Sequence, residues 1–266
     1  MPPELTVLHV VAIFASGVAA GTINAVVGSG TLITFPVLLA LGYPPLTANI
    51  SNNIGLIPGG LTGSWGYRRE LDTMRETLRL LLPWSIGGGL AGALLLLLLP
   101  EATFDAVVPA LVTLAVVLVL IQPLLQEAIR KRSERIDLEH SDLVRNEHGG
   151  WPARLTAFGC AIYGGYFGAA QGVLLMGLLP LVLSADLQRL NGTKNVLTAA
   201  VNAIAAVMFV VLAFDRIDWW VVLMIAAGST LGGSLGAGLG RRLHPTLLRV
   251  VIAVVGMVAV VRLLTT

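Results

Sequence analysis

The sequence predicts an all-α polytopic membrane protein, built as two inverted repeats of five segments each. Three observations lead to this prediction: the composition, a series of apolar blocks as long as membrane spans, and an internal repeat. Of the 266 residues, 56% are hydrophobic and only 12% are charged, about half the charged fraction of roughly 25% in soluble domains. Because so few polar residues cannot cover a water-soluble globule, we expect the chain to lie in a lipid bilayer.

The composition and motifs also exclude several other classes of protein. Cys160 is the single cysteine and the net charge is +2, so neither a disulfide framework nor a basic nucleic-acid-binding face is expected. No His/Cys/Glu cluster has metal-ligand spacing, and no Walker lysine follows a glycine-rich loop. Ser29 has no embedded histidine beyond the isolated His9 to act as its base. We therefore expect no enzyme, cofactor, metal or nucleic-acid partner.

The apolar blocks predict eight long helices and two short, broken segments. A spanning helix needs roughly 20 mostly apolar residues. Breaks at charged residues, proline and glycine give the long blocks 5–27, 46–66, 78–99, 104–125, 154–171, 196–213, 219–239 and 246–264. The short blocks are 29–42 and 172–184, each interrupted by glycine and proline.

The long polar stretch 126–153 divides the chain. We expect it to be a solvated cytoplasmic linker between a first membrane repeat, residues 1–125, and a second, residues 154–266.

The basic residues predict the orientation, because cytoplasmic loops are enriched in lysine and arginine. With the linker in the cytoplasm and all ten blocks crossing, both termini lie outside. Of the 17 basic residues, only Arg216 and Arg262 then fall outside. If the two short blocks were re-entrant, Arg241, Arg242 and Arg249 would lie outside as well. We therefore expect ten crossings of a bacterial inner membrane.

The internal repeat appears when the sequence is shifted by 142 residues. Gly30 then falls on Gly172, and the segment Asn49–Asn53 falls on Asn191–Asn195. Each unit holds five blocks in the same order, one long, one short and three long. Because five is odd, the second unit enters the membrane from the opposite side, as in many secondary transporters.

The matched residues predict a site for a small oxyanion. In each unit, a glycine-containing turn precedes the short block, and an Asn/Ser/Thr-rich segment leads into the next long helix. Free N–H groups and the helix dipole make such helix starts favourable for anions, and broken helices at membrane depth line cavities or are buried. Two facing units would add one cation, Lys194. The candidate substrate-binding residues are Gly28, Ser29, Gly30, Asn49, Ser51, Asn53, Gln171, Gly172, Asn191, Thr193, Lys194 and Asn195.

Simpler interpretations of the same residues remain open at this point. The asparagines of the two matched segments are also favourable caps for helix N-termini. Lys194 could extend to the cytoplasmic interface as an anchor instead of facing the anion. The glycine runs 87–89 and 232–233 are more typical of tight helix packing than of a site.

Several segments resemble the sulfite exporter TauE/SafE family of membrane permeases. They are Asn24-Ala-Val-Val-Gly28-Ser-Gly30-Thr-Leu-Ile-Thr-Phe-Pro36, Gly42-Tyr-Pro44, Ala48-Asn-Ile-Ser51, Tyr67–Leu71, Gly192-Thr193-Lys194 with Asn202, and Asp215–Trp219. The resemblance covers nearly the whole chain apart from the linker. It implies a permease that moves small sulfur-containing anions such as sulfite, sulfoacetate or aromatic sulfonates, commonly outward. The residues themselves argue only for a small anion.

The expected function is a secondary transporter, acting as an exporter, that binds a small sulfur-containing anion between two helix N-termini near the membrane midplane. A small-anion channel and a membrane scaffold are the alternatives. A channel would show flux that does not saturate, and a scaffold would show none. The exact substrate, the direction, the coupling ion and the oligomeric state, with a homodimer among the options, stay open.

Overall fold

The fold is a bundle of membrane-spanning helices, as the sequence predicts. The computed structural model describes residues 6–139, 150–239 and 245–265, and these ranges contain helices and no strand. Five of the described helical segments are long and apolar enough to cross a membrane. They belong to α1 (Val7–Val26), α6 (Arg75–Leu98), α7 (Glu101–Glu139), α10 (Leu187–Leu212) and α11 (Trp219–Leu239). The further long helices are α8 (Gly150–Tyr166) and α12 (Pro245–Thr265).

Two short helices take the places of the two short blocks. Helix α2 (Thr31–Ala40) has 10 residues and α9 (Gln171–Val182) has 12. At a rise of about 1.5 Å per residue they are roughly 15 and 18 Å long, about half of a hydrocarbon core of roughly 30 Å. Each packs against the long helix before it. We call α1 with α2 the first hairpin, and α8 with α9 the second hairpin.

The predicted single span 46–66 is instead two helices. Helix α3 (Pro45–Gly55) ends before Leu56, and α4 (Ile57–Gly66) starts directly after it. Pro58 stands in the first turn of α4, where its missing N–H leaves no helical bond unmade, whereas in mid-helix it would break one. The proline therefore divides the apolar block, which a count of apolar residues does not detect.

The predicted start of the span at 196 is also wrong, because α10 begins at Leu187. Its N-cap is Asp186, whose carboxylate accepts hydrogen bonds from the backbone N–H groups of Gln188 and Arg189. This cap starts the helix before the polar segment. The segment 191–195 consequently lies in the second turn of the helix instead of at its start, and it is buried.

The expected linker lies between α7 and α8. Helix α7 continues to Glu139, so its last turns occupy the first part of the polar stretch, and residues 140–149 lie outside the described residues. Two short elements complete the chain: α5 (Arg68–Asp72), between α4 and α6, and the 3-10 turn η1 (Phe214–Arg216), before α11.

Glycines allow long helices to pack with their backbones in contact. An added Cβ on Gly88 of α6 would lie 2.4 Å from the Phe158 carbonyl oxygen of α8, and one on Gly232 of α11 would lie 2.0 Å from that of Val18 in α1. These distances leave no room for a side chain. The packing role predicted for these glycine runs is confirmed at Gly88 and Gly232.

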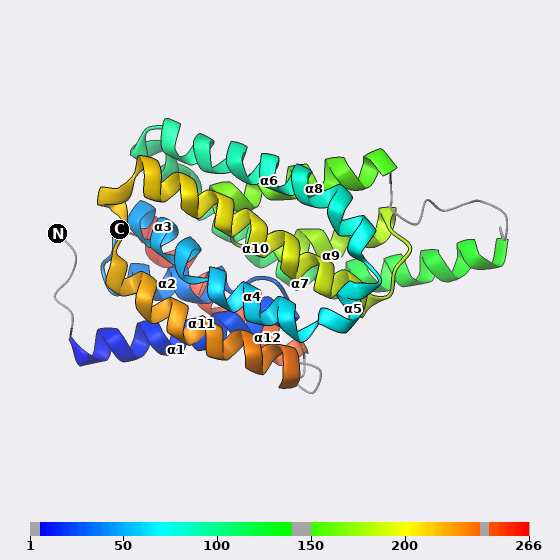
Figure 1. Ribbon diagram of the computed structural model, residues 1–266. Helices are drawn as coiled ribbons and strands as arrows, with labels where there is room; N and C mark the ends of the chain where they lie inside the picture. Colours follow the sequence, from blue (N-terminus) through cyan, green and yellow to red (C-terminus); the bar gives the residue numbers. More distant parts are fainter. Residues whose placement is uncertain (1–5, 140–149, 240–244, 266) are drawn as a thin grey trace.

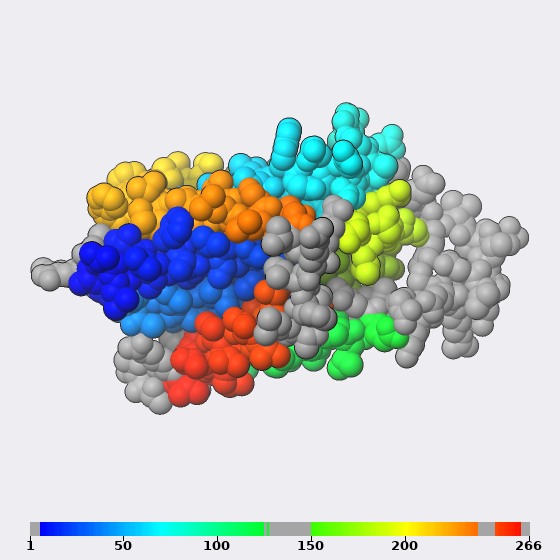
Figure 2. All heavy atoms as spheres, turned by 90° about the horizontal axis from the view of Figure 1, so that it is seen from below, coloured from blue at the N-terminus to red at the C-terminus, as the bar shows by residue number. Residues whose placement is uncertain are grey.

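The axes of the long helices lie roughly along one line, the long axis of the bundle, with the chain running in both directions (Figure 1). The start of α1 and the end of α12 lie at one end of the bundle, and α5 lies at the opposite end (Figure 1). The space-filling view agrees, with the first turns of α1 and the last described turns of α12 toward the same end (Figure 2).

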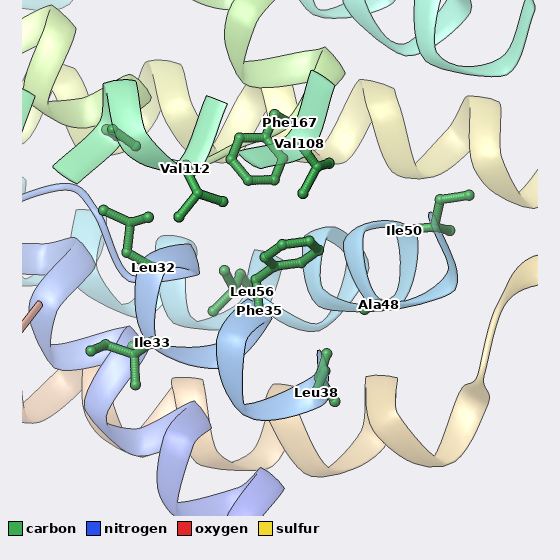
Figure 3. Packing of buried hydrophobic residues seen from close by; sticks show 14 of the residues in the cluster. Leu32, Ile33, Phe35, Leu38, Ala48, Ile50, Leu56, Val108, Val112 and Phe167 are labelled. Atoms are coloured by element: carbon green, nitrogen blue, oxygen red, sulfur yellow. The ribbon is translucent and has the colours of Figure 1, made fainter. Parts of the chain in front are cut away.

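The hydrophobic core joins the two hairpins. Phe35 of α2 and Phe167, at the end of α8, pack edge to face with ring centroids 5.2 Å apart. Figure 3 shows these two rings facing each other, with Leu32 of α2 and Val112 of α7 beside them. Packing of two buried aromatic rings fixes the position of one hairpin relative to the other.

Candidate functional site

The tips of the two hairpins touch. A Cβ added to Gly28, at the first tip, would lie 2.6 Å from the Cα of Gly172, and a Cβ on Gly172 would lie 2.6 Å from the Cα of Gly28. Gly28 has φ +93°, a conformation that L side chains rarely adopt. The glycines therefore bring the first turns of α2 and α9 together inside the protein. We call the segments 28–30 and 168–172 the hairpin junction.

The first tip is fixed by an asparagine of α1. The side-chain oxygen Oδ1 of Asn24 accepts a hydrogen bond from the backbone N–H of Gly30, with the two atoms 2.6 Å apart. This bond satisfies one of the free donors at the start of α2. At the second tip the chain turns through Gly168 and Ala170, both with positive φ.

Lys194 extends from α10 toward the first tip. Only 1% of its surface is exposed, and its ammonium donates a hydrogen bond of 2.9 Å to the backbone carbonyl oxygen of Asn24. A Cβ on Gly28 would lie 3.2 Å from the Lys194 Cδ. The side chain thus lies inside the protein beside the junction, and not at the membrane interface.

Lys194 is also electrostatically exceptional. Among the residues whose burial the structure describes, it is the one buried Lys, Arg, Asp or Glu. A buried charge is costly unless other groups compensate it. The hydrogen bond of the Lys194 ammonium goes to the carbonyl end of α1, which carries partial negative charge.

Two matched asparagines cross between the halves of the chain. Asn49 of α3 donates to the carbonyl oxygen of Tyr166 at the end of α8, at 3.1 Å. Asn191 of α10 donates to the carbonyl oxygen of Ala25 at the end of α1, at 3.3 Å. Each asparagine therefore holds the hairpin of the other half. The alternative that they cap helices is wrong, because the N-caps are Pro44 and Asp186.

Unpartnered polar groups lie at the two tips. The hydroxyl of Ser29 and both amide atoms of Gln171 are buried and have no hydrogen-bond partner, and each residue is 1% exposed. The 142-residue repeat pairs Ser29, two residues before α2, with Gln171, the first residue of α9. Leaving such groups unpartnered is costly, and each one calls for a ligand or a water molecule. Amide, hydroxyl and ammonium donors together favour an anion.

The sequence profile described as "Sulfite exporter TauE/SafE" matches residues 13–263. The chain belongs to the sulfite exporter TauE/SafE family. It is accordingly a membrane transporter and a multi-pass bacterial membrane protein. The resemblance of the sequence segments to this family is thereby confirmed.

Proteins named as probable membrane transporters from several bacteria are similar to nearly the whole chain. A probable membrane transporter protein of Haemophilus influenzae is 27% identical over 242 residues, covering 91% of this chain and 89% of the relative. The probable membrane transporter protein YfcA of Escherichia coli K12 is 24% identical over 253 residues, which cover 95% of this chain and 88% of the relative. The probable membrane transporter protein ORF9 of a Sinorhizobium species is 26% identical over 253 residues, which cover 95% of this chain and 91% of the relative. No solved structure matches.

Ser51 and Thr193 form hydrogen bonds with backbone groups that do not belong to the junction. The Ser51 hydroxyl accepts a hydrogen bond from the backbone N–H of Asp218, immediately before α11. The Thr193 hydroxyl donates to the carbonyl oxygen of Arg189 in its own helix. In this TauE/SafE family protein, Ser51 thus contacts the start of α11 and Thr193 contacts its own helix.

Asn53 and Asn195 lie near the tips with only long hydrogen bonds. Asn53 donates to Asn202 Oδ1 at 3.4 Å, and Asn195 donates to the Ala25 carbonyl oxygen at 3.5 Å. A Cβ on Gly168 would lie 3.8 Å from the amide nitrogen of Asn53, which places Asn53 beside the second tip.

The candidate residues named from the sequence do not include Asn24 and Asn202, although both contact other residues of the site. Asn24 anchors both Gly30 and Lys194, and Asn202 accepts from Asn53. Both are asparagines inside apolar blocks, a placement that is costly unless their polar groups are satisfied. That placement is the signal that could have identified them.

Proposed function

We propose that this protein is a secondary transporter that exports a small sulfur-containing anion, such as sulfite, sulfoacetate or another organosulfonate. The anion binds at the hairpin junction, between the N-termini of α2 and α9. The observation that carries the proposal is the burial of Lys194 beside two facing helix starts, with no buried carboxylate among the residues whose burial is described. A small anion is the ligand that this charge balance favours.

The chemistry of the junction suits an oxyanion. The first turn of α9 supplies backbone N–H donors, whereas the N–H groups of Gly30, Leu32 and Ile33 at the start of α2 are already hydrogen-bonded within the protein. Both helix starts supply partial positive charge. The Ser29 hydroxyl and the Gln171 amide, both unpartnered, supply further donors to sulfonate or sulfite oxygens. Lys194 supplies a compact point charge without imposing the planar geometry of a guanidinium.

The contacts between the halves support a carrier over an open channel. The backbones of Gly28 and Gly172 touch, so the junction closes the interior between the tips. The two cross-half bonds, from Asn49 to Tyr166 and from Asn191 to Ala25, are nearly equivalent under the repeat. Helices α1 and α8 also start at opposite ends of the bundle (Figure 1). These features support two inverted repeats, 1–125 and 154–266, on either side of the linker 126–153.

Alternating access by such repeats would expose the junction to each side of the membrane in turn. The test is thermal unfolding of the purified protein with sulfite, thiosulfate, a small organosulfonate or sulfate, followed by flux measurements in proteoliposomes. We expect one or more of the sulfur anions to raise the midpoint of unfolding and to show saturable flux. Flux without saturation would indicate a channel. No stabilisation and no flux with any of these anions would overturn the proposal.

A further inference from the structure

A small cavity adjoins the hairpin junction between α4 and α10. Its volume is about 10 Å³, about the space that one water molecule needs. Asn24 and Gly28 form the wall next to the junction. Leu56, the residue between α3 and α4, also lines the cavity. The rest of the wall is formed mainly by Gly59, Gly60, Gly63, Asn195, Thr198 and Asn202.

The glycines of this wall have different reasons to lack a side chain. A Cβ on Gly59 would lie 2.6 Å from the backbone carbonyl oxygen of Ser229, so Gly59 is required for packing against α11. A Cβ on Gly63 would lie 3.5 Å from the Ala25 Cβ and 3.8 Å from the Asn195 amide nitrogen, which are ordinary contact distances. Packing therefore allows a methyl group at Gly63. The lack of a side chain at this position keeps the cavity open.

The opposite wall carries polar atoms without partners. The hydroxyl of Thr198 is buried and makes no hydrogen bond. Asn195 is 5% exposed, and its single hydrogen bond, from the amide nitrogen to Ala25, is 3.5 Å long. Its side-chain oxygen has no partner among the described residues. No carboxylate lines the cavity, and Lys194 is bonded to Asn24 of the same wall.

We propose that this cavity is a segment of the substrate path, leading from the hairpin junction toward the end of the bundle where α5 lies. Thr198 and Asn195 hydrogen-bond the anion as it passes, and Gly63 keeps the path wide enough. The inference rests on the proposed function and deepens it. An anion is larger than one water molecule, so passage needs α4 to move away from α10, and the break between α3 and α4 at Leu56 provides the hinge.

The test is sulfite flux in proteoliposomes, measured beside sulfite-dependent thermal stabilisation of the same proteins. Gly63→Ala adds one methyl group to the path and should lower flux about tenfold, which corresponds to about 1.4 kcal/mol on the barrier to passage. Thr198→Val keeps the shape, removes the hydroxyl proposed to hydrogen-bond the passing anion and should lower flux about threefold. Both variants should keep the stabilisation by sulfite, because the junction is intact. Gly159→Ala is the matched control, since Gly159 of α8 is exposed and its Cβ would meet nothing within 4 Å.

The outcomes separate this inference from the proposed function. If the unmodified protein moves sulfite and both variants move it equally fast, the path runs elsewhere and the proposed function stands. If the unmodified protein neither binds nor moves any sulfur anion, the proposed function itself fails, and the path with it. If Gly63→Ala unfolds at a lower temperature without sulfite, its flux cannot be interpreted and the flux of Thr198→Val is the test. Normal flux in Thr198→Val then overturns the proposal that the cavity is part of the substrate path.

Discussion

The ammonium of Lys194 lies 2.9 Å from the backbone carbonyl oxygen of Asn24. This bond joins a cation in the second half of the chain to the end of α1 in the first half. Its acceptor is a neutral carbonyl group and not a carboxylate, so the positive charge is stabilised but not cancelled. The same asparagine fixes Gly30 at the first tip. The charge and the helix start that are proposed to bind the anion are therefore held by one residue.

The proposed topology predicts the positions of two tags. A reporter fused after Thr266 should be external, and a reporter inserted after Glu139, at the end of α7, should be cytoplasmic. The reason is that ten crossings in two inverted units put the linker opposite both termini. Protease protection in oriented vesicles measures both positions. Two tags on the same side would contradict the ten-crossing arrangement.

The contact between the hairpin tips predicts unequal effects of two glycine substitutions. Gly28 and Gly42 have nearly the same φ, +93° and +88°, but a Cβ on Gly42 would meet nothing within 4 Å. Gly42→Ala should therefore cost about 1–2 kcal/mol from the backbone alone. Gly28→Ala should cost clearly more, because its Cβ would clash with Gly172. Thermal unfolding and folded yield measure both, and equal losses would contradict the tip contact.

The asparagines near the tips should affect binding more than stability. Asn53→Ala and Asn195→Ala each remove only a hydrogen bond of 3.4 or 3.5 Å within the protein, so the folded yield should stay close to that of the unmodified protein. If each amide binds the anion, its loss should weaken binding by about 1.5–3 kcal/mol. Titration of sulfite or of the most stabilising sulfonate measures this.

A matched control for these variants is Asn52→Ala. The Asn52 side chain is hydrogen-bonded to both Thr31 and Thr34 of α2, so its removal should lower the midpoint of thermal unfolding. Normal anion affinity in both Asn53→Ala and Asn195→Ala, or a failure of both to fold, would show that their role is structural.

The spans could be predicted from the sequence because length and hydropathy alone determine which segments can cross a bilayer. The short helices α2 and α9 were predicted for the same reason. The start of α10 could not be predicted in this way, since its first turns are polar. The segment 191–195 in its second turn is buried, because Asn191 and Lys194 find partners in α1. Such contacts join residues about 170 positions apart, which no local pattern contains.

The repeat anticipates part of the arrangement at the two hairpin tips. The repeat identified Ser29 and Gln171 as equivalent positions, and the structure finds both buried and unpartnered. The repeat pairs Gly172 with Gly30, however, whereas the structure brings Gly172 against Gly28. Which glycines touch depends on the three-dimensional packing of two hairpins, and the repeat cannot specify it.

The most direct test of the account is the affinity for sulfite of Lys194→Gln and Lys194→Arg, measured by titration of the purified proteins at low salt, where electrostatic attraction is least screened. Glutamine keeps a donor for the Asn24 carbonyl oxygen and removes the charge, so Lys194→Gln should lose most of the binding. Lys194→Arg should retain part of it with altered selectivity among sulfur anions, because a planar fork replaces a point charge. Unchanged affinity in Lys194→Gln would contradict the proposal that the Lys194 charge binds the anion.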